Sequence, residues 1–104
     1  MRVLLAENDP VDRHRLSRLM SRWNLDVLEC EEGDEAWQVL AGDEAPRLVV
    51  LDWMMPGLSG LEICRRVRDR EDKVYTYIVL VTGRQDASDV EMGLDAGADD
   101  YLFK

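Results

Sequence analysis

Short apolar runs alternate along this chain with stretches in which apolar residues recur at helical spacing. The runs predict five strands, over residues 3–6, 25–30, 48–51, 77–81 and 100–103. The spaced stretches predict four helices, over residues 10–23, 34–40, 61–67 and 87–94. Strands that alternate with helices, without an internal repeat, indicate an α/β fold with a doubly wound, five-stranded parallel sheet. Periodicity leaves the order of the strands open.

The first helix carries the clearest boundary signals. Asp9 is the expected N-cap and Pro10 the first helical residue, while Asp12 adds negative charge to the first turn. Trp23 and Trp37 are interpreted as core or helix-packing residues rather than as a partner surface. The helix is expected to bury one apolar stripe, made of Leu16, Leu19, Met20 and Trp23.

Asp52 closes the apolar run 48–51 and is followed by Trp53 and then by a Pro56-Gly57 turn signal. A run without polar alternation is typical of a strand buried on both faces of a parallel sheet. In such sheets ligands bind beyond the carboxyl ends of the strands. We therefore expect Asp52 to face solvent at the edge where chemistry is done. The alternative is that it only caps a loop or a helix.

Composition narrows the class of protein. The chain has 104 residues, 46% hydrophobic and 34% charged, as expected for one soluble globular domain. No apolar run is as long as a membrane span and no signal-peptide pattern is present, so we expect a cytoplasmic location. The net charge of −9 argues against direct nucleic-acid binding. Cys30 and Cys64 lack metal-binding spacing and are expected to be free core thiols. His14 is expected to be a surface residue.

Polar residues follow four of the five predicted strands. They are Glu7, Asn8 and Asp9 after the first, Asp52 after the third, Thr82 after the fourth and Lys104 after the fifth. Because parallel strands bring their carboxyl ends to one edge of the sheet, these groups are expected to converge on one pocket. Crowded carboxylates repel one another and are stabilised by a cation. Oxygen ligands favour Mg²⁺, which is usually held by one or two carboxylates plus a substrate phosphate.

This set predicts phosphoryl transfer to Asp52. The ionised carboxylate attacks phosphorus in line, while Mg²⁺ and Lys104 offset charge on the equatorial oxygens and Thr82 supplies a hydroxyl donor. No general base is needed. Taken singly, Glu7 could be an exposed loop acid, Thr82 a turn residue and Lys104 a solvated chain end. Their coincidence at the strand ends favours the joint interpretation.

Four stretches that together span the chain, VLLAENDP, LVVLDWMMPGLSGLE, IVLVTG and GADDYLFK, resemble the motifs of response-regulator receiver domains. The resemblance implies the flavodoxin-like strand order 2-1-3-4-5. It implies that Asp52 accepts a phosphoryl group from a phosphohistidine on a histidine kinase or phosphotransfer protein. It also implies that the domain switches conformation to regulate an output domain or protein, and that its only catalysis is its own phosphorylation and dephosphorylation.

The resemblance further assigns roles to single residues. Mg²⁺ or Mn²⁺ is held by Glu7, Asn8, Asp52 and the backbone carbonyl of Met54. Thr82 and Lys104 contact the phosphoryl group, and Thr82 also moves with Tyr101 when the fourth helix and fifth strand rearrange as output. Met54 and Arg84 occupy the positions that tune loss of the phosphoryl group to water. Since methionine does not position a water and arginine can cover the phosphoryl oxygens, slow autodephosphorylation is predicted.

Two features depart from the family pattern. Asn8 stands where the family usually has Asp, and its amide oxygen can ligate Mg²⁺ but adds no charge, which predicts weaker metal binding unless Asp9 compensates. The family also continues past this Lys104 through a Pro and a fifth helix. We therefore expect residues 1–104 to be a receiver domain truncated before its fifth helix, part of a longer protein, with self-association through the uncovered face as the lesser alternative.

Other classes of function fit the sequence less well. A phosphatase with an aspartyl nucleophile needs a second acid at position 54, where Met54 stands. A flavin carrier needs a phosphate loop after the first strand, where the acidic Glu7 to Asp9 segment lies. The main alternative is a phosphorylation-independent interaction module that keeps the receiver fold. Asn8 supports that alternative, while Asp52, Thr82 and Lys104 argue against it.

Overall fold

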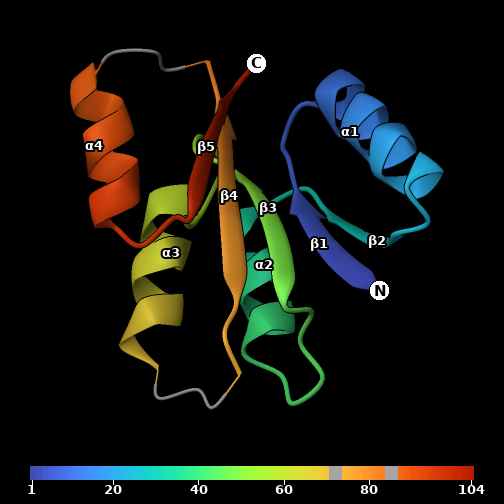
Figure 1. Cartoon of the computed structure of the whole chain (residues 1–104), viewed down its shortest axis with the longest axis horizontal. Coiled ribbons are helices and arrows are strands. Elements are labelled where there is room, and N and C mark those ends of the chain that lie inside the picture. Colours follow the sequence, from blue (N-terminus) through green and yellow to red (C-terminus); the bar gives the residue numbers. More distant parts are fainter. Residues whose placement is uncertain (71–73, 84–86) are drawn as a thin grey trace.

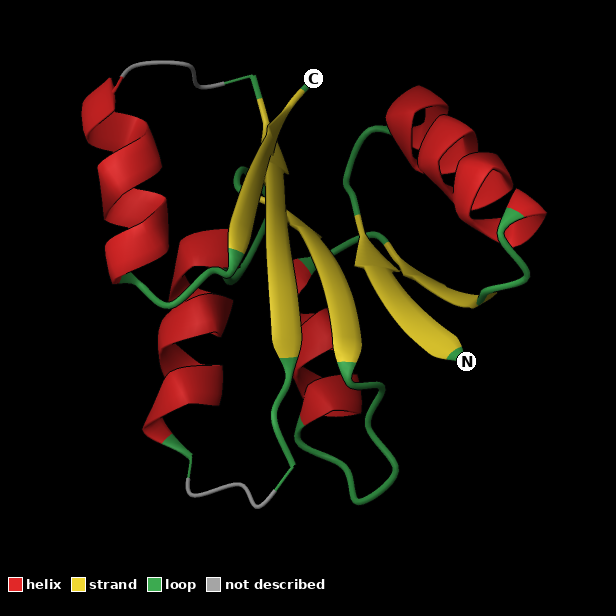
Figure 2. Cartoon of the chain, viewed as in Figure 1, coloured by secondary structure: helices red, strands yellow, loops and turns green. Residues whose placement is uncertain are grey.

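The computed structural model describes residues 1–70, 74–83 and 87–104 (Figure 1). Its strands are β1 (Arg2–Ala6), β2 (Asp26–Cys30), β3 (Leu48–Asp52), β4 (Tyr77–Thr82) and β5 (Asp100–Phe103). Its helices are α1 (Pro10–Arg22), α2 (Gly33–Leu40), α3 (Gly60–Asp69) and α4 (Ala87–Asp95). The strands form one parallel sheet in the order β2-β1-β3-β4-β5, which confirms the predicted fold. Figure 2 shows this sheet as the centre of the molecule, with the helices around it.

Side-chain caps mark the start of α1 and of α3, and the cap at Asp9 confirms the predicted start of α1. At α1, the Asp9 carboxylate accepts hydrogen bonds from the backbone N–H groups of Val11 (2.8 Å) and Asp12 (3.2 Å), with Pro10 in the first turn. At α3, the Ser59 hydroxyl accepts from the N–H of Glu62 (3.2 Å). Both caps lie beside the carboxyl edge of the sheet, so they fix where these helices leave the strands.

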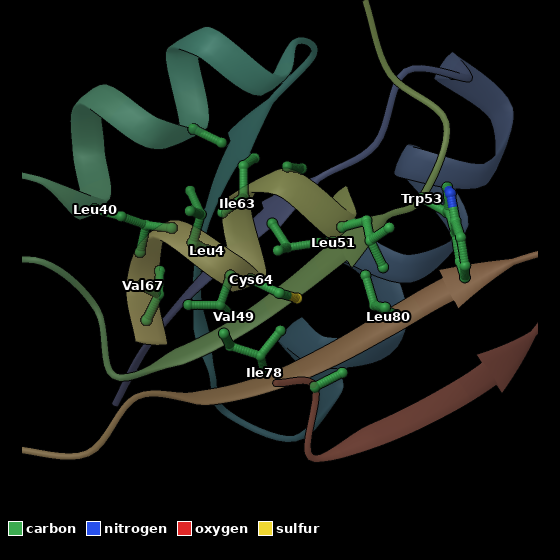
Figure 3. Packing of buried hydrophobic residues seen from close by; sticks show 14 of the residues in the cluster. Leu4, Leu40, Val49, Leu51, Trp53, Ile63, Cys64, Val67, Ile78 and Leu80 are labelled. Atoms are coloured by element: carbon green, nitrogen blue, oxygen red, sulfur yellow. The ribbon is translucent and has the colours of Figure 1, made fainter. Parts of the chain in front are cut away.

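Alternate strand residues build two apolar clusters, one on each face of the sheet. The larger cluster lies between the sheet and helices α2 and α3, and includes Leu4, Val49, Leu51, Ile63, Cys64 and Leu80 (Figure 3). The smaller cluster lies under α1, and includes Val3, Leu5, Met20, Val50 and Val81. Alternate residues of β1 thus serve opposite faces, as the pattern of a strand buried on both faces predicts. Both cysteines are free and buried, as expected.

The predicted burial of the α1 stripe is wrong for two of its four residues. Met20 is buried, but Leu19 is 42% exposed and Trp23 63% exposed. They border an apolar cleft of about 260 Å³ between α1 and the sheet. Within the described residues α1 is the only helix that packs on this face of the sheet. Helical periodicity therefore identified the apolar side of α1 correctly, but the described residues do not cover all of that side.

Trp37 and His14 lie where the sequence predicts. The half-buried Trp37 ring packs against the larger cluster, and the guanidinium groups of Arg66 and Arg70 lie 5.6 and 5.5 Å from its centre. His14 is exposed on α1. Among the described residues, no helix is long and apolar enough to cross a membrane.

Candidate functional site

Strand register brings the predicted site residues together at the carboxyl edge of the sheet. Ala6 pairs with Leu51 in register, so Glu7, directly after β1, lies beside Asp52, the last residue of β3. Thr82 closes β4, and its carbonyl oxygen accepts a hydrogen bond from the N–H of Lys104 at 2.9 Å. Four elements that are distant in sequence therefore supply one site.

Lys104 connects the carboxylates of this site. Its ammonium group forms an ion pair with Glu7 and lies 3.4 Å from carboxylate oxygens of both Asp52 and Asp12. The other Asp52 oxygen, Oδ1, accepts a hydrogen bond from the N–H of Met54 at 3.4 Å. One cation thus faces three carboxylates, which come from β1, β3 and α1.

Asp52 is only 5% exposed, which corrects the expectation that it faces solvent. β3 is the middle strand of five, so the end of Asp52 is flanked by the ends of β1 and β4 and is covered by Lys104. The position at the edge of the sheet was predicted correctly. Its burial follows from the neighbouring side chains rather than from the strand pattern.

Glu7 is the most strongly perturbed acid of the site. It is 1% exposed. Burial, and next the neighbouring Asp52, raise the pKa of Glu7 to about 8, although contact with Lys104 works in the opposite direction. Partial burial opposes the charge on Lys104, but Glu7, Asp52 and Asp12 outweigh it and raise the pKa of the ammonium group. One lysine therefore neutralises these acids incompletely.

The donor set fits a hard divalent cation. Oε2 of Glu7 is buried and accepts no hydrogen bond from any described residue. Two buried carboxylates, from Glu7 and Asp52, lie beside the exposed Asn8 and the loop of Met54. No group of three or more His, Cys, Asp or Glu side chains in metal-binding geometry occurs among the described residues. Mg²⁺ is usually held by one or two protein carboxylates together with waters, and Glu7 and Asp52 supply two carboxylates here.

The two proposed switch residues lie on β4 and β5. Thr82 is buried at the end of β4. The half-buried Tyr101 ring packs edge to face against Trp53 at 6.1 Å and against Phe103 at 5.4 Å. Trp53 directly follows Asp52 in the chain, so the Tyr101 ring contacts the residue next to Asp52. Of the two residues expected to tune dephosphorylation, Met54 is exposed and Arg84 lies outside the described residues.

Two residues of α1 join the site in ways the sequence analysis missed. Asp12, expected only to favour the start of the helix, reaches Lys104. Arg13 donates hydrogen bonds to the backbone carbonyl oxygens of Glu7 (2.9 Å) and Asn8 (3.5 Å), and so holds the β1–α1 loop. The sequence signal was the cap itself, because a helix that begins at Pro10 brings its first turn to the edge where β1 ends.

Comparison with known proteins identifies the family. Residues 3–104 match the response regulator receiver domain. The chain belongs to the response regulator receiver family. It is 43% identical over 101 residues to the phosphate regulon transcriptional regulatory protein PhoB of Rhizobium meliloti (strain 1021), covering 89% of this chain and 42% of PhoB. It is 42% identical to the response regulator MprA of Mycolicibacterium vanbaalenii, covering all of this chain and 44% of MprA.

Solved receiver structures agree with this assignment. The BeF3-activated N-terminal receiver domain of Klebsiella pneumoniae RstA superposes with a TM-score of 0.88 at 31% identity, over 100% of this chain and 86% of that one. The Mn²⁺-bound response regulator Rcp1 shares the fold, with a TM-score of 0.88 at 21% identity, over 99% of this chain and 80% of that one. The chain spans less than half the length of the curated relatives above. As a receiver domain, it acts in phosphorelay signalling by two-component systems.

Proposed function

We propose that Asp52 of this receiver domain accepts a phosphoryl group from a phosphohistidine on a histidine kinase or phosphotransfer protein. The observation that carries the proposal is the contact of the Asp52 carboxylate with Lys104, beside the buried Glu7 and at the end of the central strand. A buried nucleophile with a fixed cation next to it fits group transfer better than a loop or capping role.

The chemistry follows from this geometry. An Asp52 oxygen attacks phosphorus in line, a P–O bond forms, and the P–N bond to the donor histidine breaks with its electron pair leaving on the nitrogen. Lys104 offsets negative charge on the equatorial oxygens, and the Thr82 hydroxyl donates to one of them. Mg²⁺ or Mn²⁺, when bound by Glu7, Asn8, Asp52 and the Met54 carbonyl, supplies further charge neutralisation. The attacking group is a carboxylate rather than a hydroxyl, so the reaction needs no general base.

Output would pass through the α4 and β5 side of the molecule. Thr82 moves toward the new phosphoryl group and Tyr101 changes rotamer, so that the surface formed by α4 and β5 differs between the two states. Support comes from the packing of Tyr101 against Trp53, which follows the phosphoacceptor directly. The downstream partner is an output domain or protein, in a cytoplasmic signalling pathway.

Intact-protein mass spectrometry after incubation with acetyl phosphate and Mg²⁺ tests the proposal, with Asp52→Asn as the control. A single phosphoryl adduct on the wild type, absent from the variant, is the expected result. The second candidate, a phosphorylation-independent interaction module, is favoured by the uncharged Asn8 at a metal-ligand position. A folded, Mg²⁺-binding sample that acquires no adduct would favour it over phosphoryl acceptance.

A further inference from the structure

The loop that joins β3 to α3 carries Met54 and is anchored at both ends. At its start, the N–H of Met54 donates to the Asp52 carboxylate. At its end, the N–H of Gly60 donates to the carbonyl oxygen of Trp53 at 3.0 Å. These contacts are local, since they lie within the loop or its flanking elements. The middle of the loop, residues 55–58, depends on support from outside the loop: Met55 and Leu58 pack against the larger cluster, and the backbone needs a contact of its own.

The first turn of α2 provides that support. The N–H of Gly33 donates to the carbonyl oxygen of Pro56 at 3.2 Å. A Cβ at position 33 would overlap the carbonyl of Leu58, and one at Gly57 would overlap the Asp34 carboxylate. Gly57 also has a φ of +75°, which any residue with a side chain adopts at a cost. Helix and loop backbones therefore touch at a point where only glycine fits.

We propose that the first turn of α2, through the close approach of Gly33 to the β3–α3 loop, positions the Met54 carbonyl for the divalent cation. The inference rests on the proposed function, because it concerns that metal site. Gly33 lies far in sequence from the loop and touches neither the metal ligands nor the phosphoacceptor. It is a positioning residue: it acts through the path of the loop backbone. Small displacements matter here because Mg²⁺ demands near-ideal octahedral geometry.

The test compares two alanine variants at opposite ends of α2. Gly33→Ala forces helix and loop apart, whereas at Gly42 an added Cβ meets the carbonyl oxygens of Val39 at 3.4 Å and Gln38 at 4.0 Å, both ordinary contacts. Mg²⁺ affinity is measured by tryptophan fluorescence, and folding by urea denaturation in chelator. Gly33→Ala is expected to bind Mg²⁺ roughly tenfold more weakly, the loss typical when support for metal ligands is disturbed. Its phosphorylation by acetyl phosphate should recover at saturating Mg²⁺, and Gly42→Ala should match the wild type.

Each outcome separates the inference from the function on which it rests. A folded Gly33→Ala variant that binds Mg²⁺ as tightly as the wild type overturns the positioning role and leaves the proposed function intact. A wild type that binds no Mg²⁺ overturns both.

A second pair of variants covers the case in which Gly33→Ala does not fold. Gly57→Ala should weaken Mg²⁺ binding, and adding Asp34→Ala, which removes the overlapping carboxylate, should restore part of it. Asp34→Ala alone is the reference for any effect of its charge. Gly57→Ala binding that matches the wild type, or a double variant without recovery, counts against the inference.

Discussion

Replacing Glu7 with glutamine should stabilise the metal-free protein while removing a proposed metal ligand. Glu7 is 1% exposed and shares one lysine with Asp52 and Asp12. Its carboxylate therefore costs free energy whenever it is ionised without a bound cation. Glutamine keeps the shape of the side chain and removes the charge, so the variant isolates that cost.

The magnitude follows from the pKa of this group. Burial and the neighbouring Asp52 raise the pKa of Glu7 from 4.5 to about 8, so the folded state favours the protonated carboxyl more than the unfolded state does. Its contribution to stability is full below pH 4.5 and is lost as the pH rises toward 8, by about 1.4 kcal/mol per pH unit. Glutamine has no proton to lose in either state, so it avoids this loss. We expect similar stability of the two proteins at about pH 4.5 and an advantage of roughly 4 kcal/mol for Glu7→Gln at about pH 7.5.

Urea unfolding in chelator at both pH values measures this difference. Glu91→Gln, on the exposed side of α4, is the matched control and should change stability by no more than about 0.5 kcal/mol. Adding Mg²⁺ should stabilise the wild type more than Glu7→Gln, because a ligand stabilises the folded state in proportion to how tightly it binds and the glutamine amide lacks the charge of the carboxylate. A Glu7→Gln variant that is less stable at both pH values, or whose advantage does not grow with pH, would refute the reasoning.

Three further predictions concern the metal, the phosphoryl group and the thiols. Asn8→Asp should bind Mg²⁺ more tightly in a fluorescence titration, because it adds a carboxylate, and equal affinities would contradict this. Met54→Asn should shorten the lifetime of the phosphoryl adduct, followed by mass spectrometry, since an amide can position the attacking water; an unchanged lifetime would remove that role. Burial raises the pKa of Cys30 and of Cys64 to about 12, so at about pH 8 the thiolate is roughly a thousandfold scarcer than for an ordinary thiol. Iodoacetamide should therefore label both cysteines in urea and neither in the native protein.

The sequence predicted the elements of the fold closely and their mutual arrangement only in part. The apolar run before Asp52 and the cap at Asp9 mark boundaries that local chemistry determines, and the structure confirms them. Strand order depends on contacts between distant segments, so periodicity left it open and the family resemblance supplied it. The exposure of Leu19 and Trp23 was missed for the same reason. A periodic pattern shows which face of a helix is apolar, but burial also requires a partner.

For the candidate site, the topology of a parallel sheet made the main residues predictable. Glu7, Asp52 and Lys104 each follow a strand, and parallel strands end on the same edge. The contacts that helices α1 and α2 make at the site could not be predicted from the strand ends. Asp12 reaches Lys104 because of the direction in which α1 leaves β1, and Gly33 touches the β3–α3 loop because of how α2 packs. The Asp12 contact is signalled only indirectly, by the helix start at Asp9 and Pro10, and the Gly33 contact has no signal in local sequence.

The two positions that follow β1 should divide stability and metal affinity between them. Glu7 is buried, so its charge is costly without a cation, while Asn8 is exposed and an acid there would remain hydrated. Asn8→Asp should then alter metal-free stability by no more than about 0.5 kcal/mol, as is usual for an exposed substitution. Its effect should appear in Mg²⁺ affinity, whereas that of Glu7→Gln appears in both quantities. A cation bound here would offset the buried charge of Glu7, so the proposed Mg²⁺ and Lys104 would complement each other at this site.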